Sequence, residues 1–384
     1  MERDELAGWL RLTLTPGVGN GAARRLLAAF GLPTAIFQQS EGALAQCVTS
    51  AQAQALCQVP PGLAPLLETT WVWLQGAAPE GTARVVLTLG DGRYPQALLE
   101  TEDPPLVLYG IGPPALWAAN PFPPDCCLAI VGSRNPTAQG ADNARQFARA
   151  LHAAGLTIVS GLALGVDAAA HEGALDSAVA GATVPATIAV VGTGLDRVYP
   201  RQNLGLARRI AANGILISEY PLGTPPLAAN FPKRNRIIAG LSQGTLVVEA
   251  ALASGSLITA RLAVEQGREV FAIPGSIHAP QSRGCHALIR QGAKLVESAQ
   301  DVLEELQLPI AAAAPQPATP GTNPAGPPES ALLQAMGFDP VGLDALMART
   351  GMDTAAMQVE LLELELAGVV ARLPGGLFQR MGSA

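Results

Sequence analysis

Basic side chains follow several apolar segments of this chain, close to the point where each segment ends. They are Arg134, Arg201 and, within the sequence FPKRNR, Lys233, Arg234 and Arg236. A guanidinium group can donate two parallel hydrogen bonds to phosphate oxygens, and it can also stack on a nucleobase. Any one of these residues alone is more simply explained as solvated surface. Three separate basic loops together favour a site for a polyanion over a site for one nucleotide.

Glycines accompany these cations in or beside the same turns. They are Gly132, Gly161, Gly165, Gly192 and Gly194. Because glycine has no Cβ, its backbone N–H can approach a phosphate oxygen closely, so we expect these turns to leave room for a ligand. Aromatic residues make up only 4% of the chain, and we therefore do not expect an aromatic platform on which bases stack.

Motifs for common cofactors and catalytic groups are incomplete or missing. Gly192 and Gly194 begin a GxGxx pattern, but Arg197 stands near the place of the third glycine, and Tyr199-Pro200 interrupts the helix that should follow. The patterns GxxxxGK[ST], HExxH and GxSxG do not occur. We expect no cofactor, no metal site and no catalytic residue.

His171 has the most suggestive surroundings of the four histidines. Asp167 precedes it by four residues and shares its helix face. The two side chains either form a functional pair or shape the turn after VSGLALG. We favour the structural interpretation.

The elements that position these residues are apolar segments rich in β-branched side chains. They lie at 83–90, 104–112, 128–132, 156–161, 187–192, 214–219, 245–250, 269–275 and 293–298. From residue 128 onward most are separated by roughly 15–25 residues of helical pattern. This alternation is typical of an α/β fold with a doubly wound, mainly parallel sheet. Ligands of such sheets bind at the carboxyl ends of the strands, where the basic residues fall.

Regions of different character flank this α/β core. The N-terminal part predicts short helices, and its turn Pro16-Gly17-Val18-Gly19 resembles that of a helix-hairpin-helix, which either contacts a DNA phosphate or only permits a tight bend. An uncharged Pro/Ala-rich segment predicts a linker. The C-terminal part predicts two helices, the second with Asp353 as N-cap and Gly368 at C′, and then a hairpin, which together indicate a winged helix. The predicted domains are 1–80, 81–308, the linker 309–328, and 329–384.

Charge and cysteine content limit the class of protein. The net charge is −7, divided as −5 over 1–127, +2 over 128–309 and −4 over 310–384. Contacts with nucleic acid would therefore be local and in the middle of the chain. Five cysteines fit neither a disulfide framework nor a zinc cluster and are expected to be reduced thiols. We see no signal peptide and no membrane-spanning run, and expect a cytoplasmic protein without a membrane partner.

Several longer stretches match a known family. They are VGSRNPTAQG, IVSGLALGVDAAAHEGAL, AVVGTGLDRVYPRQN, LISEYPLGTPPLAANFPKRNRIIAGLSQGTLVVEA, SGSLITARLAVEQGREVFAIPGSI and GCHALIRQGAKLV. With them, residues 83–306 resemble the bacterial DNA-processing protein A (DprA/Smf) family. The resemblance implies an extended Rossmann-like fold, an N-terminal sterile-alpha-motif-like domain and a C-terminal winged helix. It also implies a non-catalytic homodimer that binds incoming single-stranded DNA in natural transformation, protects it and loads the RecA recombinase.

The resemblance extends to individual residues. Arg134 takes the position of the arginine in the family's phosphate pocket, and Arg201 stands where relatives often have lysine. Leu252 and Ile258 fall where relatives make dimer or RecA contacts. The candidate nucleic-acid-binding residues are Gly132, Ser133, Arg134, Ser160, Gly161, Gly194, Arg201, Lys233, Arg234, Asn235 and Arg236.

The alternative is an enzyme, a nucleotide N-glycosidase similar to the phosphoribohydrolases with a PGGxGTxxE motif. The stretch GLSQGTLVVEA retains Gly244-Thr245 and has Glu249 as its candidate carboxylate. Leu241-Ser242 replaces the double glycine, however, and the carboxylate spacing differs by one residue. We therefore favour the non-catalytic function.

The expected second helix of the winged helix is acidic. The stretch TAAMQVELLELELAG carries Glu360, Glu363 and Glu365 and no basic residue. Phosphates would repel such a helix from a DNA groove. This pattern predicts contact with a protein rather than with duplex DNA.

Overall fold

The computed structural model describes residues 1–119, 121–123, 125–179, 181–307, 330–338, 340–373 and 375–381. The predicted linker at 309–328 lies outside the described residues. The predicted domain boundaries stay predictions, and the elements on either side of the linker are described below.

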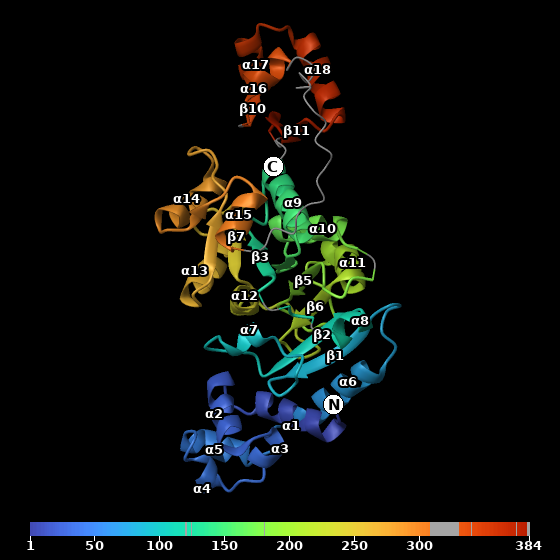
Figure 1. Ribbon diagram of the computed structural model, residues 1–384, viewed down its shortest axis with the longest axis vertical. Helices are drawn as coiled ribbons and strands as arrows, with labels where there is room; N and C mark the ends of the chain where they lie inside the picture. The colour runs from blue at the N-terminus through green and yellow to red at the C-terminus, as the bar shows by residue number, and fades with distance from the viewer. Residues whose placement is uncertain are drawn as a thin grey trace.

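Nine strands of the described residues form one sheet in the order β1-β2-β6-β5-β4-β3-β7-β8-β9 (Figure 1). They are β1 (Ala83–Thr88), β2 (Val107–Gly112), β3 (Cys127–Val131), β4 (Thr157–Ser160), β5 (Thr187–Val190), β6 (Ile215–Ser218), β7 (Gly244–Val247), β8 (Glu269–Ala272) and β9 (Lys294–Leu295). Strands β3 to β9 are all parallel, whereas β2 is antiparallel to both β1 and β6. The predicted mainly parallel sheet is confirmed, and each predicted apolar segment overlaps a strand.

The chain winds outward from β3 in both directions. It passes through β4, β5 and β6 on one side, and through β7, β8 and β9 on the other. The point at which the winding reverses therefore lies between β3 and β7. In doubly wound sheets this switch point is where a crevice opens beyond the carboxyl ends of the strands.

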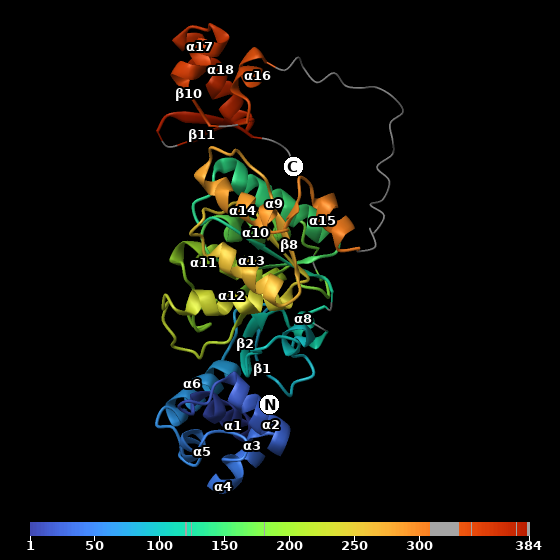
Figure 2. The same ribbon diagram turned by 90° about the vertical axis from the view of Figure 1, so that its left-hand side faces the viewer.

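Helices cover both faces of the sheet, which explains why the parallel strands β3 to β7 are buried at every position. Leu128 and Ile130 of β3 pack on one face, while Ala129 and Val131 pack on the other. Figures 1 and 2 show α12 and α13 on one side and α9, α10 and α11 on the opposite side. The helices and 3₁₀ turns of this region are α7 (Gln96–Leu99), α8 (Pro114–Ala118), α9 (Ala138–Ala153), α10 (Val166–Asp176), η1 (Arg201–Asn203), α11 (Leu204–Asn213), α12 (Asn230–Leu241), α13 (Ser256–Glu265), η2 (Pro280–Ser282), α14 (Arg283–Arg290) and α15 (Ala299–Glu305).

Short helices form the N-terminal region and continue the core of the sheet. They are α1 (Arg3–Leu14), α2 (Asn20–Phe30), α3 (Pro33–Ile36), α4 (Glu41–Leu44), α5 (Ser50–Leu56) and α6 (Leu63–Gln75). Their buried residues Leu6 and Trp9 belong to the same apolar cluster as Val86 of β1 and Tyr109 of β2. In the turn between α1 and α2, Gly17 has φ +76° and its carbonyl accepts a hydrogen bond from the Gln52 side chain at 2.7 Å.

The C-terminal elements form a winged helix with its own apolar core. They are α16 (Ala331–Met336), β10 (Val341–Gly342), α17 (Leu343–Thr350), α18 (Thr354–Leu366), β11 (Val370–Leu373) and β12 (Leu377–Arg380). The Asp353 carboxylate caps α18 by accepting the N–H groups of Ala355 and Ala356, and Gly368 follows the helix with φ +71°. Both predicted caps are confirmed.

Two further sequence expectations concern thiols and membranes. All five cysteines are free thiols, as predicted. Within the described residues, the helices are too short or too polar to cross a bilayer.

Candidate nucleic-acid interface

Three exposed cations lie at the carboxyl edge of the parallel strands. Arg134 is in the turn after β3, Arg201 begins η1 beyond β5, and Lys233 is in the first turn of α12, which follows the loop after β6. We call Arg134, Arg201 and Lys233 the basic rim. Because parallel strands end at the same edge, segments that are far apart in the sequence meet there.

The turn that carries Arg134 is held by backbone and hydroxyl contacts. The Ser133 hydroxyl accepts the Asn135 N–H at 3.1 Å, and the Ser133 carbonyl accepts the Val166 N–H at 3.1 Å. Gly165 packs directly against this turn with φ +79°, and a Cβ there would overlap the carbonyl oxygens of Ser133 and Arg134. The turn after β3 is therefore fixed against the loop after β4.

The turn that carries Arg201 is tied to the same loop. Asn203 is nearly fully buried, and its side-chain amide donates to the carbonyls of Leu162 and Ala163 at 3.0 and 3.1 Å. The loop after β4 thus binds the Arg134 turn on one side and the Arg201 turn on the other. This arrangement brings the two arginines to one edge although 67 positions separate their numbers in the sequence.

A buried carboxylate supports this loop from below. Asp167, in the first turn of α10, accepts the N–H groups of Gly161 at 3.1 Å and Ala163 at 3.3 Å. Burial raises the pKa of Asp167, while the nearby Arg234 guanidinium and these hydrogen bonds act in the opposite direction. The structural interpretation of Asp167 is therefore supported by its contacts.

Arg234 does not reach the ligand edge, which corrects its assignment as a binding residue. It is 4% exposed, and its Nη1 donates to the carbonyls of Gly161, at 2.6 Å, and Val190. Burial lowers the pKa of Arg234 to about 10, so the side chain is still charged at neutral pH. FPKRNR was predicted to lie in a loop, but it forms the first turns of α12. Neighbouring residues of a helix point in different directions, and Arg234 points into the protein.

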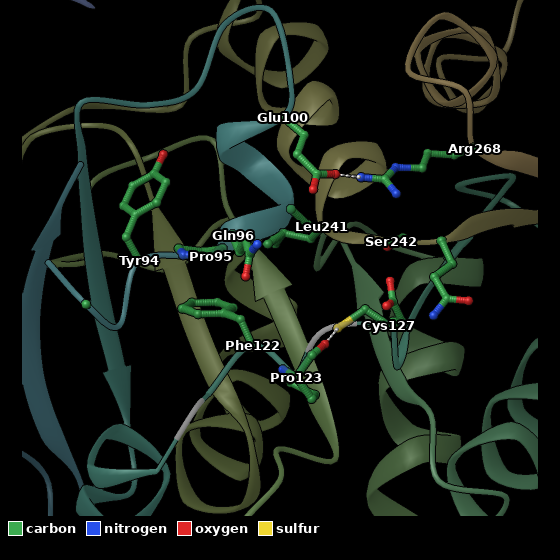
Figure 3. Close-up of a pocket in the computed structure, with 14 residues that line it drawn as sticks. Tyr94, Pro95, Gln96, Glu100, Phe122, Pro123, Cys127, Leu241, Ser242 and Arg268 are labelled. Carbon is green, nitrogen blue, oxygen red and sulfur yellow. Dashed lines mark hydrogen bonds and ion pairs between the residues drawn. The ribbon is translucent and has the colours of Figure 1, made fainter. Parts of the chain in front are cut away.

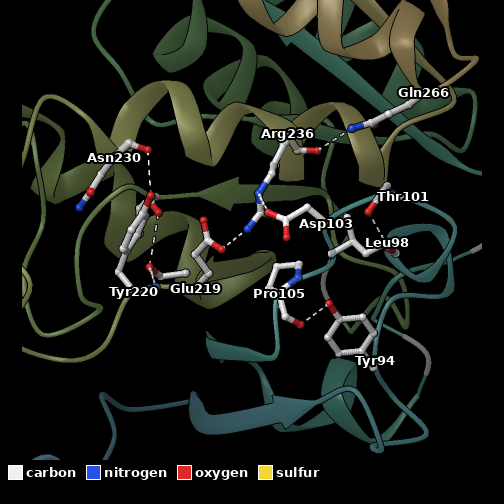
Figure 4. A network of polar contacts seen from close by, with 12 residues as sticks. Tyr94, Leu98, Thr101, Asp103, Pro105, Glu219, Tyr220, Asn230, Arg236 and Gln266 are labelled. Atoms are coloured by element: carbon white, nitrogen blue, oxygen red, sulfur yellow. Dashed lines mark hydrogen bonds and ion pairs between the residues drawn. The ribbon is translucent and has the colours of Figure 1, made fainter. Parts of the chain in front are cut away.

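Arg236 and Asn235 also face other parts of the protein. Arg236 pairs with Glu219 and, at 3.1 Å, with Asp103 (Figure 4). Burial raises the pKa of Glu219, and Arg236 counters this effect. The Asn235 amide donates weakly to the Gly255 carbonyl at 3.4 Å. The assignment of Arg236 as a DNA contact is corrected, since packing of α12 turns its side chain toward the connection between β1 and β2. The assignment of Asn235, which is half-buried and points toward α13, stays a prediction.

Ser160 and the glycines are explained by internal packing. Ser160 is fully buried and its hydroxyl donates to the Ile130 carbonyl at 2.6 Å, so its side chain does not face a ligand. A Cβ at Gly161 would overlap the Arg234 guanidinium, and one at Gly194 would overlap Asp196. A Cβ at Gly132 would come within 2.9 Å of neighbouring side-chain and backbone atoms. These contacts by themselves require glycine, and the assignment of Gly132, Gly161 and Gly194 as phosphate contacts stays a prediction.

An aromatic pair beside the basic rim was missed by the sequence reasoning. The rings of Tyr199 and Phe231 lie 5.6 Å apart at 41°, and Tyr199 is 48% exposed. Each ring is two residues from a rim cation, Arg201 and Lys233 respectively. Low aromatic content was a poor guide, because it says nothing about where the few rings lie. The sequence YPR next to a predicted ligand turn could have indicated this pair.

His171 is a buried structural residue below the rim. Its Nδ1 lies 2.7 Å from the Thr187 hydroxyl, which donates its own proton to the Ile158 carbonyl. Nδ1 therefore carries a proton and donates it to the Thr187 hydroxyl. Burial, together with the Arg234 charge, lowers the pKa of His171 to about 3.

A cavity of ≈ 200 Å³ lies at the opposite edge of the sheet (Figure 3). Its lining includes Cys127, Gln243 and Arg268, which lie at or just before the amino ends of β3, β7 and β8. Arg268 is paired with Glu100 at 3.3 Å. This cavity is therefore separate from the basic rim, and the residues predicted to bind DNA do not line it.

The residues assigned to dimer or RecA contacts differ in exposure. Leu252 is 61% exposed and lines an open apolar groove with Pro274, Ile277 and Leu295 beside the edge strand β9. Ile258 is half-buried on α13 and does not line that groove. The groove supports Leu252, more than Ile258, as part of a contact surface.

Glu249, the carboxylate of the enzyme alternative, is held by the protein itself. One oxygen accepts the Thr137 N–H at 3.0 Å, and the other accepts the Thr137 hydroxyl at 2.6 Å. A carboxylate with both oxygens engaged in this way is poorly placed to act on a nucleotide. The N-glycosidase alternative is not favoured.

Sequence comparisons relate this chain to known families. Residues 85–307 match the family model described as DNA recombination-mediator protein A, and residues 312–376 match the DprA winged helix domain. The chain is 46% identical over 288 residues to Protein Smf of Escherichia coli (strain K12), with 74% of each chain covered. It is 48% identical over 217 residues to DNA processing protein DprA of Streptococcus pneumoniae, which covers 56% of this chain and 72% of the relative.

The fold agrees with these matches. The X-ray structure of DNA processing protein A from Streptococcus pneumoniae aligns with a TM-score of 0.63 and 36% identity, covering 79% of this chain and 98% of that one. The strands of the α/β core lie almost entirely within the range matched by the first family model, and most of the winged helix lies within the range matched by the second. The chain therefore belongs to the DNA recombination-mediator protein A (DprA/Smf) family.

Proposed function

We propose that this protein binds single-stranded DNA through the basic rim, without catalysing a reaction on it. The observation that carries this proposal is that Arg134 and Arg201 are exposed on two turns fixed to the same loop. Two guanidinium groups carried on turns that are fixed to one loop are suited to phosphates of one strand. Lys233 adds a third positive charge at the same edge.

Binding at this rim would be independent of sequence. The cations neutralise phosphates and release counterions, which favours association with any strand. Single strands also present unstacked bases, and the exposed ring of Tyr199 beside Arg201 offers a surface for one of them. The preference for a single strand then follows from base contact that a duplex does not permit.

The role in the cell follows from the family. We infer that the bound DNA is incoming single-stranded DNA of natural transformation, that binding protects it, and that RecA is then loaded on it. Membership in the DNA recombination-mediator protein A family supports this inference. The relative from Streptococcus pneumoniae is named a DNA processing protein, which agrees with a role in handling DNA.

We further propose that two copies of the chain associate through the groove around Leu252. Ile277 and Leu295, both at least half exposed, extend the apolar surface beside the edge strand β9. Apolar groups of this kind at a sheet edge are typical of contact surfaces. A dimer would present two basic rims to one strand and would raise affinity through effective concentration.

The acidic winged helix is proposed to contact a protein. On α18, Glu363 and Glu365 are exposed together with the apolar residues Val359, Leu362 and Leu366. This surface would repel phosphate but could pack against a protein. We expect residues 329–384, expressed alone, to leave duplex DNA unshifted in a gel at physiological salt; a shifted band would contradict the proposal.

The decisive experiment is single-stranded DNA binding across salt concentrations. Arg134→Ala and Arg201→Ala should each weaken binding by about tenfold or more, because a charge-assisted contact is lost. Each should also make the slope of log K against log[salt] shallower by about 0.7. Arg3→Ala removes one exposed charge from α1 and serves as the matched control. Unchanged affinity and slope in both rim variants would refute the assignment.

A further inference from the structure

The switch point between β3 and β7 is the usual ligand position of a doubly wound sheet. Anionic groups of ligands commonly bind there at the N-terminus of the first crossover helix, where unpaired N–H groups and the helix dipole favour negative charge. In this protein that helix is α9, which begins at Ala138 after the turn that carries Arg134. What fills this position decides whether a free nucleotide can use it.

The carboxylate of Glu249 fills it. Glu249 follows β7, the neighbour of β3 in the sheet, and both of its carboxylate oxygens accept hydrogen bonds from Thr137, the N-cap of α9. The Thr137 hydroxyl in turn accepts the Gly140 N–H at 3.0 Å. The carboxylate is therefore connected to the helix N-terminus directly by one N–H and indirectly through a hydroxyl.

Two glycines make room for this residue. A Cβ at Gly140, in the first turn of α9, would overlap the Glu249 carboxyl group. A Cβ at Gly132 would lie 2.9 Å from the Glu249 main-chain oxygen. In nucleotide-binding folds, glycines at such places permit close approach of phosphate. Here the same close approach is made by a side chain of the protein.

We propose that Glu249 acts as an internal anion that occupies the phosphate position of this fold and excludes the phosphate of a free nucleotide. Its negative charge repels a second anion, and its carboxyl group takes the space and the donors that phosphate would need. The protein is thereby restricted to the basic rim, beyond β3 and β5, for binding phosphates. Glu249 is thus a specificity-determining residue, and this inference does not depend on single-stranded DNA being the ligand at the rim.

The test is thermal unfolding with inorganic phosphate as the probe, against sodium chloride at equal ionic strength. In Glu249→Ala, ~10 mM phosphate should raise the Tm by about 2 °C or more beyond the effect of chloride, because a vacated anion position binds phosphate in the folded state only. The wild type and Glu265→Ala, which removes an exposed carboxylate from α13, should show a clearly smaller difference, because phosphate then meets only the basic rim. Adenosine monophosphate should act like phosphate on Glu249→Ala.

Each outcome decides the proposal. A phosphate-specific shift in the wild type as large as in Glu249→Ala would overturn it, and so would a folded Glu249→Ala without that shift. If Glu249→Ala is unfolded in chloride buffer, phosphate is expected to restore its circular dichroism, and failure to do so would also overturn it. Salt-dependent binding of single-stranded DNA, measured on Arg134→Ala, tests the rim separately, so failure of one conclusion is distinguishable from failure of the other.

Discussion

The turn after β3 and the first turns of α12 both present arginines near one edge of the sheet, yet they use them differently. Arg134 is exposed, whereas Arg234 is 4% exposed and donates to two carbonyls at the ends of β4 and β5. Arg236 forms ion pairs with Glu219 and Asp103. The turn projects beyond the strand, where few atoms surround it, while α12 packs on the sheet and buries one face.

This difference shows how the same residue type supports either ligand binding or the fold. A guanidinium group in an open turn keeps its donors free for phosphate. The same group on a packed helix donates hydrogen bonds to buried backbone carbonyls at the ends of strands. Arg234 therefore stabilises the loop after β4, to which the turns that carry Arg134 and Arg201 are bound.

The largest expected effect is a difference in stability between the variants Arg234→Ala and Arg134→Ala. Arg234→Ala should lower the free energy of unfolding by about 3–5 kcal/mol, because it leaves Asp167 and two carbonyls buried without the cation. Arg134→Ala should change it by less than about 0.5 kcal/mol, as is usual for an exposed side chain. Urea denaturation of both variants measures the two changes in the free energy of unfolding. Equal losses of stability would remove the distinction between the two regions.

A second effect is the pH dependence of stability that arises from the buried His171. Burial lowers the pKa of His171 to about 3, whereas an unfolded histidine titrates near ~6.5. The neutral His171 contributes fully to the free energy of unfolding above pH ~6.5. Below that pH only the unfolded chain takes up the proton, so the free energy of unfolding falls by about 1.4 kcal/mol per pH unit as the pH drops toward 3. His171→Gln should flatten this part of the curve of Tm against pH. An identical curve would contradict the buried, neutral state.

A smaller effect is expected at Arg236. Arg236→Gln should lower the free energy of unfolding by about 1–2 kcal/mol through loss of charge-assisted hydrogen bonds. The slope of DNA binding against salt should stay that of the wild type, because Arg236 faces Glu219 and not the rim. A shallower slope in a stably folded Arg236→Gln would place this arginine among the phosphate contacts after all.

The smallest effect is expected for Lys233, which lies next to the buried Arg234 on α12. Lys233→Ala should leave stability unchanged within about 0.5 kcal/mol. It should make the salt slope of single-stranded DNA binding shallower by about 0.7, with an affinity loss of a few-fold. Lys233 would then behave like Arg134 although its neighbour Arg234 does not. Fluorescence anisotropy with a labelled oligonucleotide at several salt concentrations provides the measurement, and an unchanged slope would exclude Lys233 from the rim.

Sequence alone predicted the scaffold well and the site in part. Each strand from β1 to β9 begins and ends close to a predicted apolar segment, because runs of β-branched residues bounded by glycine leave few alternatives. Arg134 and Arg201 were assigned correctly to exposed turns beyond β3 and β5. The sequence FPKRNR was wrongly taken as a loop, since nothing in those letters shows that the start of α12 packs against Gly161.

The amino-acid sequence by itself determined the succession of strands and turns along the chain, because periodicity and turn residues are local properties. Its motifs also determined the family. Only the tertiary structure decided which cations reach solvent, since burial depends on what packs against each helix face. It also decided the contacts of Glu249, whose carboxylate accepts hydrogen bonds from Thr137, 112 positions earlier in the sequence. Contacts at such separation arise because parallel strands end at a common edge, and no local pattern records them.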